Sequence, residues 1–257
     1  MTADIFHCVG DLMGDSLALA RMAAESDADI IVQAGVHFMA ETVAVLSHPH
    51  QEVWITNPKA GCTMEMLAKD HMVLPIADQL IDRYGDDLLV VAYMNTSGRL
   101  KALAGRTGGA VCTSSNAQHV VRWAREQGKK IFFVPDQHLG RNVADQLGMD
   151  PASLLALPDP GTFSGSYRLE DVDGGLKALD AAEMILWGSF CGVHTVFKPE
   201  MVEYWKRDGR TVLVHPESPV ETVRAADGSG STNFLWKAVM DAKPGGRLAI
   251  GTEGHLV

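Results

Sequence analysis

Short apolar runs alternate along the chain with segments whose apolar positions recur at helical spacing. The runs predict buried strands, because a strand covered on both faces carries apolar residues at consecutive positions. The predicted strands lie in ADIIVQAGV, EVWITNP, LLVVAYMN, KKIFFVPD, AAEMILWG, RTVLVHPE and RLAIGTE. The predicted helices lie in DSLALARMAAES, NAQHVVRWAREQG, KPEMVEYWKRDG and STNFLWKAVMDAK. This alternation is typical of parallel βαβ units, so we expect an α/β fold.

Capping residues mark the starts of several predicted helices. Asp15 and Ser16 precede the first helical segment, and Ser231 and Thr232 follow a GSG turn. In contrast, residues 150–175 are rich in Pro, Gly and Ser and only weakly periodic. We interpret that segment as a long loop or insertion.

Polar side chains stand where the predicted strands end. Tyr93 and Asn95 end one strand, Ser114 follows the short run GAV, and His215 and Glu217 follow RTVLV. The carboxyl ends of parallel strands meet at one edge of a sheet, where loops and helix N-termini converge on ligands. The sequence therefore predicts that in each domain one edge of the sheet, at the carboxyl ends of its strands, binds ligands.

Composition narrows the class of partner. The chain has 257 residues, of which 46% are hydrophobic and 21% charged, and its formal net charge is -10 without any basic run. This charge argues against a nucleic-acid surface and against an anionic membrane, and favours small molecules. The N-terminus has no basic region followed by an apolar one, and no apolar run reaches the ~20 residues that span a bilayer. We expect a cytoplasmic protein.

The four cysteines are too sparse for a disulfide framework and form no CxxC pair. Any metal site must therefore collect ligands from distant segments. Cys62 precedes a helical pattern, so it is either a thiolate at a helix N-terminus or a buried core residue. Cys191 ends a strand shortly before His194 and is open to three uses: core residue, nucleophile or metal ligand. Cys112 is best interpreted as a packed small residue, and Cys8 is uninformative.

The other polar motifs also allow two interpretations. CTSSNA and GSGST could present hydroxyls and N–H groups to an anion, or could simply cap helices. Tyr93 and Asn95 could contact a substrate or pack across strands, and His194 could be a satisfied core residue. His215 and Glu217 flank a proline at a strand end, a position with little structural need for them, so an acid/base or substrate-orienting pair is plausible.

Ten motifs taken in order resemble quinolinate synthase over nearly the whole chain: GDSLALA, GVHFMAE, AGCTMEM, AYMNTS, CTSSNA, FVPDQHLGRN, WGSFCGVH, VHPESP, GSGST and IGTEG. The resemblance implies an enzyme of NAD biosynthesis that condenses iminoaspartate with dihydroxyacetone phosphate, releasing phosphate and water. It also implies three αβα sandwich domains with short parallel sheets around a 4Fe-4S cluster, which three cysteines hold. We place these domains at residues 1–71, 72–190 and 191–257.

The resemblance also implies roles for single residues. Cys62 and Cys191 would be cluster ligands, and an iron without a protein thiolate would act as a Lewis acid. The implied catalytic residues are Tyr93, His194, His215 and Glu217. The implied substrate-binding residues are Asp15, Ser16, Met39, Tyr93, Asn95, Ser114, His215, Glu217, Ser231 and Thr232. L-Aspartate oxidase would be a partner that supplies iminoaspartate.

The chain departs from the family pattern at both ends. The family begins with a strand ending in a His-Tyr-Tyr type motif, and its third cluster cysteine lies beyond the TEG segment, whereas this chain starts close to GDS and stops at GTEGHLV. We therefore expect a polypeptide truncated at both ends, with incomplete first and third domains. One alternative is a cluster-free α/β protein that binds a small dicarboxylate or phosphorylated ligand. Another is a hydrolase with Cys191 as nucleophile and His194 as base.

Overall fold

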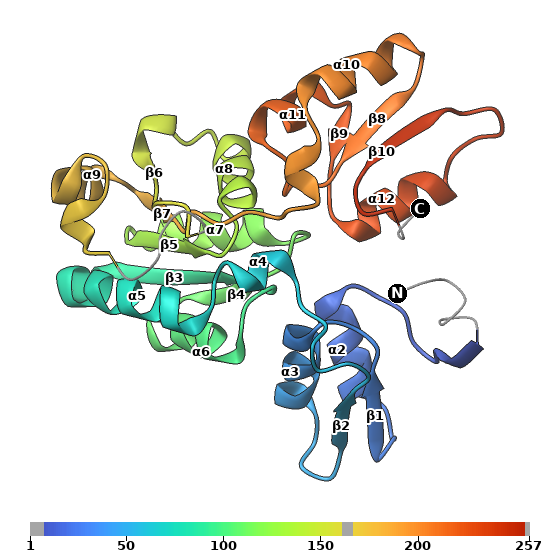
Figure 1. Cartoon of the computed structure of the whole chain (residues 1–257), viewed down its shortest axis with the longest axis horizontal. Coiled ribbons are helices and arrows are strands. Elements are labelled where there is room, and N and C mark those ends of the chain that lie inside the picture. The colour runs from blue at the N-terminus through green and yellow to red at the C-terminus, as the bar shows by residue number, and fades with distance from the viewer. Residues whose placement is uncertain (1–7, 161–166, 255–257) are drawn as a thin grey trace.

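The structure is a computed structural model that describes residues 8–160 and 167–254. These residues form three separate β-sheets in which every strand pairing is parallel, with helices packed on the sheets (Figure 1). The predicted α/β fold with short parallel sheets is confirmed.

The first sheet has two strands and one covered face. Its elements are β1 (Ile30–Gln33), β2 (Glu52–Ile55), α2 (Ser16–Ala24) and α3 (His37–Leu46). Ile31 and Val53 point toward a small core that the two helices complete. The alternate positions Ile30, Val32 and Trp54 are 60%, 62% and 59% exposed. Within the described residues, the helices therefore cover this sheet on one side only.

The middle sheet has five strands in the order β4-β3-β5-β7-β6. They are β3 (Leu88–Tyr93), β4 (Ala110–Cys112), β5 (Lys130–Val134), β6 (Leu154–Ala156) and β7 (Met184–Leu186). Every residue of β3 is buried, as its unbroken apolar run predicts. This strand therefore lies inside the middle sheet, between β4 and β5, and its last residue, Tyr93, stands at the carboxyl edge.

Helices cover both faces of the middle sheet, which makes it an αβα sandwich. One face packs on α5 (Asp70–Tyr84), α6 (Gly98–Arg106) and α9 (Gly175–Ala181), and the other on α4 (Thr63–Met66), α7 (Ala117–Glu126) and α8 (Gln137–Gln146). Alternate strand residues divide between the two cores: Val90 and Phe132 belong to the first, Val91 and Phe133 to the second.

The third sheet has the strand order β10-β8-β9. Its elements are β8 (Thr211–Val214), β9 (Gly228–Ser229), β10 (Leu248–Gly251), α10 (Pro199–Arg207), α11 (Val220–Ala225) and α12 (Thr232–Met240). Val202 of α10 packs against Val212 and Val214 of β8. Strand β8 thus lies at the centre of this sheet and leads directly into the segment that carries His215 and Glu217.

The sequence prediction for residues 150–175 was wrong in part. Strand β6 lies in this segment and pairs with β7, from Leu154 beside Met184 to Ala156 beside Leu186. Its three residues are half-buried, so the strand is too short and too exposed to give a clear apolar pattern. Residues 161–166 lie outside the described residues.

Each strand and helix predicted from the pattern is present, and both predicted caps are confirmed. The Asp15 carboxylate accepts a hydrogen bond from the Ala18 N–H at the start of α2, and the Ser231 hydroxyl accepts one from the Phe234 N–H in α12. Single-turn 3-10 helices occupy Gly85–Asp87, Pro151–Ser153, Leu169–Asp171 and His194–Val196. Among the helices described, none has the length and apolar character needed to cross a bilayer.

Candidate functional site

Glu217 is the centre of a buried polar cluster between the middle and third sheets. It follows β8 in a turn that the Ser218 N–H closes on the His215 carbonyl. Glu217 is 3% exposed, and its carboxylate accepts hydrogen bonds from the Tyr93 hydroxyl at 2.7 Å and from His194 Nδ1 at 2.9 Å. The ends of β3 and β8 therefore meet, although these strands belong to different sheets.

His194 connects this carboxylate to a thiol and a hydroxyl. It lies in the 3-10 turn after Cys191, and its Nδ1 is 3.2 Å from the Cys191 Sγ. Its Nε2 is 3.1 Å from the Thr252 hydroxyl, just beyond β10. Since an ionised Glu217 can only accept, the proton of a neutral His194 lies on Nδ1, and Nε2 accepts from Thr252.

His215 stacks on His194, with 4.3 Å between ring centroids. Its Nδ1 accepts the Glu217 N–H at 3.4 Å, so its own proton lies on Nε2. Burial lowers the pKa of His215 to about 4. At neutral pH, His215 is therefore an uncharged ring with one N–H available to donate.

The ionisation of Glu217 is set by the groups that touch it. Burial by itself raises the pKa of its carboxyl, but the hydrogen bond from His194 and the neighbouring imidazoles and phenol lower the pKa below its usual range. Burial and the charge of Glu217 raise the pKa of the Tyr93 phenol well above its ordinary value. Glu217 is thus a carboxylate at neutral pH. Tyr93 stays protonated and donates a hydrogen bond to it.

Asp136 fixes the position of Cys191. It is fully buried at the start of α8, where one carboxylate oxygen accepts the Leu139 N–H at 2.6 Å. The other oxygen accepts the Cys191 N–H at 2.8 Å. Asp136 is not among the site residues predicted from the sequence, because its partner is 55 residues away.

Cys62 comes close to the same cluster from the first part of the chain. It is the N-cap residue of α4, and the Asn95 side chain lies within hydrogen-bonding reach of its thiol. The residues that follow the two cysteines also touch, because the Gly192 N–H donates to the Thr63 hydroxyl at 3.3 Å. Cys62 and Cys191 therefore lie in neighbouring segments, whereas Cys112 is fully buried in the core, as predicted.

These residues offer suitable donors for a metal. The Cys191 thiol, a His194 nitrogen and a Glu217 carboxylate oxygen lie within 4.8 Å of one another. Thiolates are the protein ligands that iron–sulfur clusters use, and the half-buried Cys62 lies in the segment that touches the residue after Cys191. The residues present thus fit two of the cysteine positions of such a cluster.

The same geometry argues against a nucleophilic Cys191. An activated thiol needs a neighbour that stabilises the thiolate. Although His194 is at hydrogen-bonding distance, burial and the negative charge of Glu217 raise the pKa of the Cys191 thiol far above its usual value. Without a metal ion to stabilise it, this thiol stays protonated.

Two predicted anion-binding helix starts face each other at the junction of the first and third sheets. The Asn233 side chain, in the first turn of α12, donates to the Asp15 carboxylate at 2.8 Å. Ser16 and Thr232 are the first residues of the two helices, so their N-termini are brought together. Met39 packs against the apolar core that also contains Tyr93 and Cys191.

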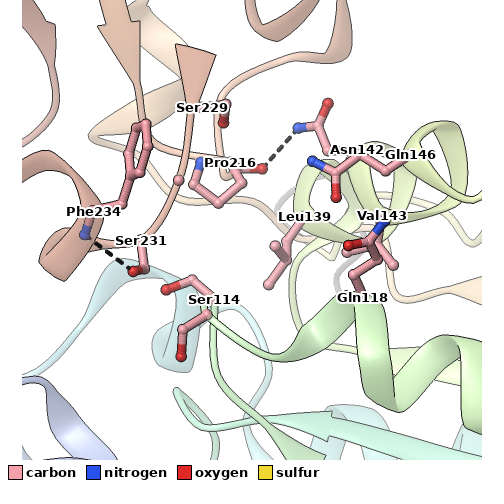
Figure 2. A pocket seen from close by; sticks show the side chains of 12 residues that line it. Ser114, Gln118, Leu139, Asn142, Val143, Gln146, Pro216, Ser229, Ser231 and Phe234 are labelled. Atoms are coloured by element: carbon pink, nitrogen blue, oxygen red, sulfur yellow. Dashed lines mark hydrogen bonds between the residues drawn. The ribbon is translucent and has the colours of Figure 1, made fainter.

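A cavity of about 350 Å³ lies between α8 and the start of α12 (Figure 2). Its lining includes the predicted residues Ser114 and Ser231, together with Pro216 and Asn142. Ser114 also lies within hydrogen-bonding reach of Tyr93. This contact connects the cavity to the cluster around Glu217.

Comparison with known proteins identifies the family. The family model for quinolinate synthetase A protein matches residues 1–257. The chain belongs to the quinolinate synthetase A family. The resemblance read from the ordered motifs is thereby confirmed.

Curated members of the quinolinate synthetase A family match over most of this chain. Quinolinate synthase from Corynebacterium glutamicum is 44% identical over 251 residues, which are 96% of this chain and 62% of that protein. The enzymes from Geobacillus thermodenitrificans and Bacillus cereus are 41% and 40% identical over 250 residues, 96% of this chain and 66% of each relative. The chain thus spans slightly under two thirds of the length of these relatives.

Proposed function

We propose that the chain carries out the quinolinate synthase reaction of NAD biosynthesis, in which iminoaspartate and dihydroxyacetone phosphate condense to quinolinate with release of phosphate and water. The observation that carries this proposal is the hydrogen-bonded group of Tyr93, His194 and Glu217 beside the thiol of Cys191. L-Aspartate oxidase would supply iminoaspartate. We place the reaction in the cytoplasm, where free thiols persist.

In this proposal Cys62 and Cys191 are ligands of a 4Fe-4S cluster. A bound cluster would supply a Lewis-acidic iron for substrate oxygen atoms. The domain boundaries proposed at 1–71, 72–190 and 191–257 put one sheet in each domain and these cysteines near the boundaries. The carboxylate of Asp136 keeps the Cys191 backbone in place.

The condensation requires protons to be removed from carbon and delivered to leaving oxygen atoms. The residues around Glu217 include both protonated groups and an ionised carboxylate, so they can do both. His215 carries a proton on Nε2 and can donate it to a carbonyl or hydroxyl oxygen. The ionised Glu217 stabilises positive charge on either imidazole, and Tyr93 holds the carboxylate in place. We assign proton transfer to His194, His215, Glu217 and Tyr93 as a group.

The remaining predicted residues would bind the charged ends of the substrates. Ser114 and Ser231 line one cavity, and Ser16 and Thr232 open helices whose N-termini favour anions. Asp15 would orient this region through Asn233. Asn95, just after β3 of the middle sheet, and Met39, in α3 beside the first sheet, would contact the substrate.

The test is quinolinate formation by the chain after anaerobic reconstitution with iron and sulfide. Iminoaspartate is generated in place from oxaloacetate and ammonia, and quinolinate is separated by chromatography. We expect the Cys191→Ala variant to lose bound iron, while a Cys8→Ala variant, which changes an exposed cysteine, keeps it. Glu217→Gln should keep iron but lose activity by ~100-fold or more.

Two results would contradict the proposal. A parent chain that holds a full cluster and makes no quinolinate would show that the buried group is not sufficient for the reaction. Absence of iron, together with binding of a dicarboxylate such as malate in calorimetry, would favour the cluster-free binding protein.

A further inference from the structure

Asn142 of α8 touches the backbone on both sides of Glu217. Its Nδ2 donates to the Pro216 carbonyl at 2.7 Å and to the Ser218 carbonyl at 2.8 Å. Figure 2 shows the first of these bonds crossing from α8 to the loop that carries Pro216. Asn142 is 1% exposed, so both bonds are shielded from water.

The orientation of this amide follows from its surroundings. Turned the other way, the Asn142 side chain would place its oxygen against two carbonyl oxygens, which cannot donate. Both N–H groups of the amide are therefore used on one peptide segment. Such a contact restrains the Glu217 backbone more strongly than one bond would, because the carbonyls before and after Glu217 are each held.

Helix α8 holds two parts of the proposed site at once. At its start, Asp136 accepts the N–H of Cys191, and further along Asn142 donates to the turn of Glu217. Leu139, between them, and Val143, next to Asn142, are buried in the core of the middle sheet. The spacing between Cys191 and Glu217 is therefore set by a rigid element that belongs to neither segment.

We propose that Asn142 is a positioning residue for Glu217. The effect of Asn142 on turnover rests on the proposed function, whereas its effect on the Glu217 turn does not. It keeps the Glu217 carboxylate within reach of Tyr93 and His194, although the turn belongs to the third sheet and Tyr93 to the middle one. Because proton transfer depends steeply on geometry, a small displacement of this turn lowers the rate of the chemical steps more than the affinity for substrate.

The test compares Asn142→Asp with Asp145→Asn. The Asn142→Asp variant keeps the size of the side chain but sets carboxylate oxygens against two carbonyls. The Asp145→Asn variant breaks an ion pair with Arg224 that joins the same helix to α11 on the surface, away from Glu217. Asn142→Leu removes the two N–H donors without adding a charge. This variant replaces Asn142→Asp in the comparison if Asn142→Asp does not fold.

The first readout is amide hydrogen exchange of Glu217 and Ser218, whose N–H groups bond to His215. In either Asn142 variant we expect exchange at these two amides to rise at least ~10-fold, with β5 and β8 unchanged. The second readout is steady-state quinolinate formation, where kcat should fall ~100-fold and KM for dihydroxyacetone phosphate should change less than ~3-fold. Asp145→Asn should leave both readouts at the parent values.

Three outcomes would overturn the proposal. These are unchanged exchange at Glu217 and Ser218, a rise in exchange spread over the whole middle sheet in Asn142→Leu, and a change in KM alone. A parent chain without activity would remove the proposed function, and the exchange measurement would still decide whether Asn142 positions the turn.

Discussion

The Tyr93 hydroxyl donates a 2.7 Å hydrogen bond to the Glu217 carboxylate across 124 positions of the chain. Tyr93 ends a strand of the middle sheet and Glu217 follows a strand of the third sheet. This bond therefore joins the carboxyl edges of two sheets. Both side chains are buried, at 5% and 3% exposed. A buried carboxylate keeps its charge only when donors surround it, and Tyr93 is one of those donors.

Replacing Tyr93 by Phe is expected to lower the free energy of unfolding by ~1.5–3 kcal/mol, because a buried charged acceptor loses a donor. Tyr84→Phe is the matched control, since the Tyr84 hydroxyl donates to the exposed carboxylate of Asp180 at 3.0 Å. Tyr84→Phe should lower the free energy of unfolding by less than ~1 kcal/mol. Urea unfolding of both variants measures the difference, and equal costs would mean that the bond to Glu217 adds nothing to stability.

Gly188 is expected to tolerate no side chain. A Cβ at this position would overlap the backbone carbonyl oxygens of Leu157 and Pro158, which cannot swing aside as a side chain can. Gly188→Ala should therefore cost ~1–3 kcal/mol or more in the free energy of unfolding. Gly105→Ala, in α6 with open space around it, should instead stabilise the protein by ~0.5–1 kcal/mol. Thermal unfolding of the two variants should shift in opposite directions, and a shift in the same direction would contradict the packing argument.

The pattern of apolar runs predicted the central strands of the middle and third sheets because these strands are largely buried. The strands of the first sheet were also predicted to be buried, but Ile30, Val32 and Trp54 are exposed, because in the described part of the chain helices cover that sheet on one side only. Strand β3 is an unbroken buried run, whereas β6 has three half-buried residues and left no comparable signal. The order of strands within each sheet depends on packing between distant segments, which periodicity does not record. The sequence therefore predicted most of the strands, but not β6 or β9, and it did not predict the order of the strands within each sheet.

For the site, the strand-end rule located Tyr93, His215 and Glu217, and the ordered motifs added Cys62 and Cys191. Three residues were missed for a physical reason: Asp136, Asn142 and Thr252 act through hydrogen bonds to groups far away in sequence. A polar residue on a helix usually faces water, so Asn142 gave no sign that it is buried. Only the tertiary structure shows which polar residues have such partners.

Thiol labelling should follow burial. Under reducing conditions without metal, we expect iodoacetamide to modify the exposed Cys8 first and the half-buried Cys62 more slowly, with Cys112 and Cys191 modified last. Mass spectrometry of a labelling time course gives the order. Selective early modification of Cys191 would instead support the nucleophile hypothesis, in which His194 activates that thiol.

Lys101 is expected to make the free energy of unfolding increase with pH. Its ammonium lies between α3 and α6, where it donates to the Thr42 hydroxyl at 2.9 Å and the Thr96 carbonyl at 2.8 Å. Burial lowers the pKa of Lys101 to about 8. In the unfolded chain a lysine has a pKa of ~10.4. Between these two values the unfolded chain binds more protons than the folded one, so the free energy of unfolding rises with pH.

The Lys101→Met variant should lack this rise. We expect the parent to gain ~2–3 kcal/mol relative to Lys101→Met between pH ~8 and pH ~10.4, because other titrating groups are common to both and cancel in the difference. Lys59→Met, which removes an exposed lysine, should follow the parent at each pH. Urea unfolding across this range measures the effect. A constant difference between parent and Lys101→Met would mean that the Lys101 ammonium is solvated as well in the folded protein as in the unfolded chain.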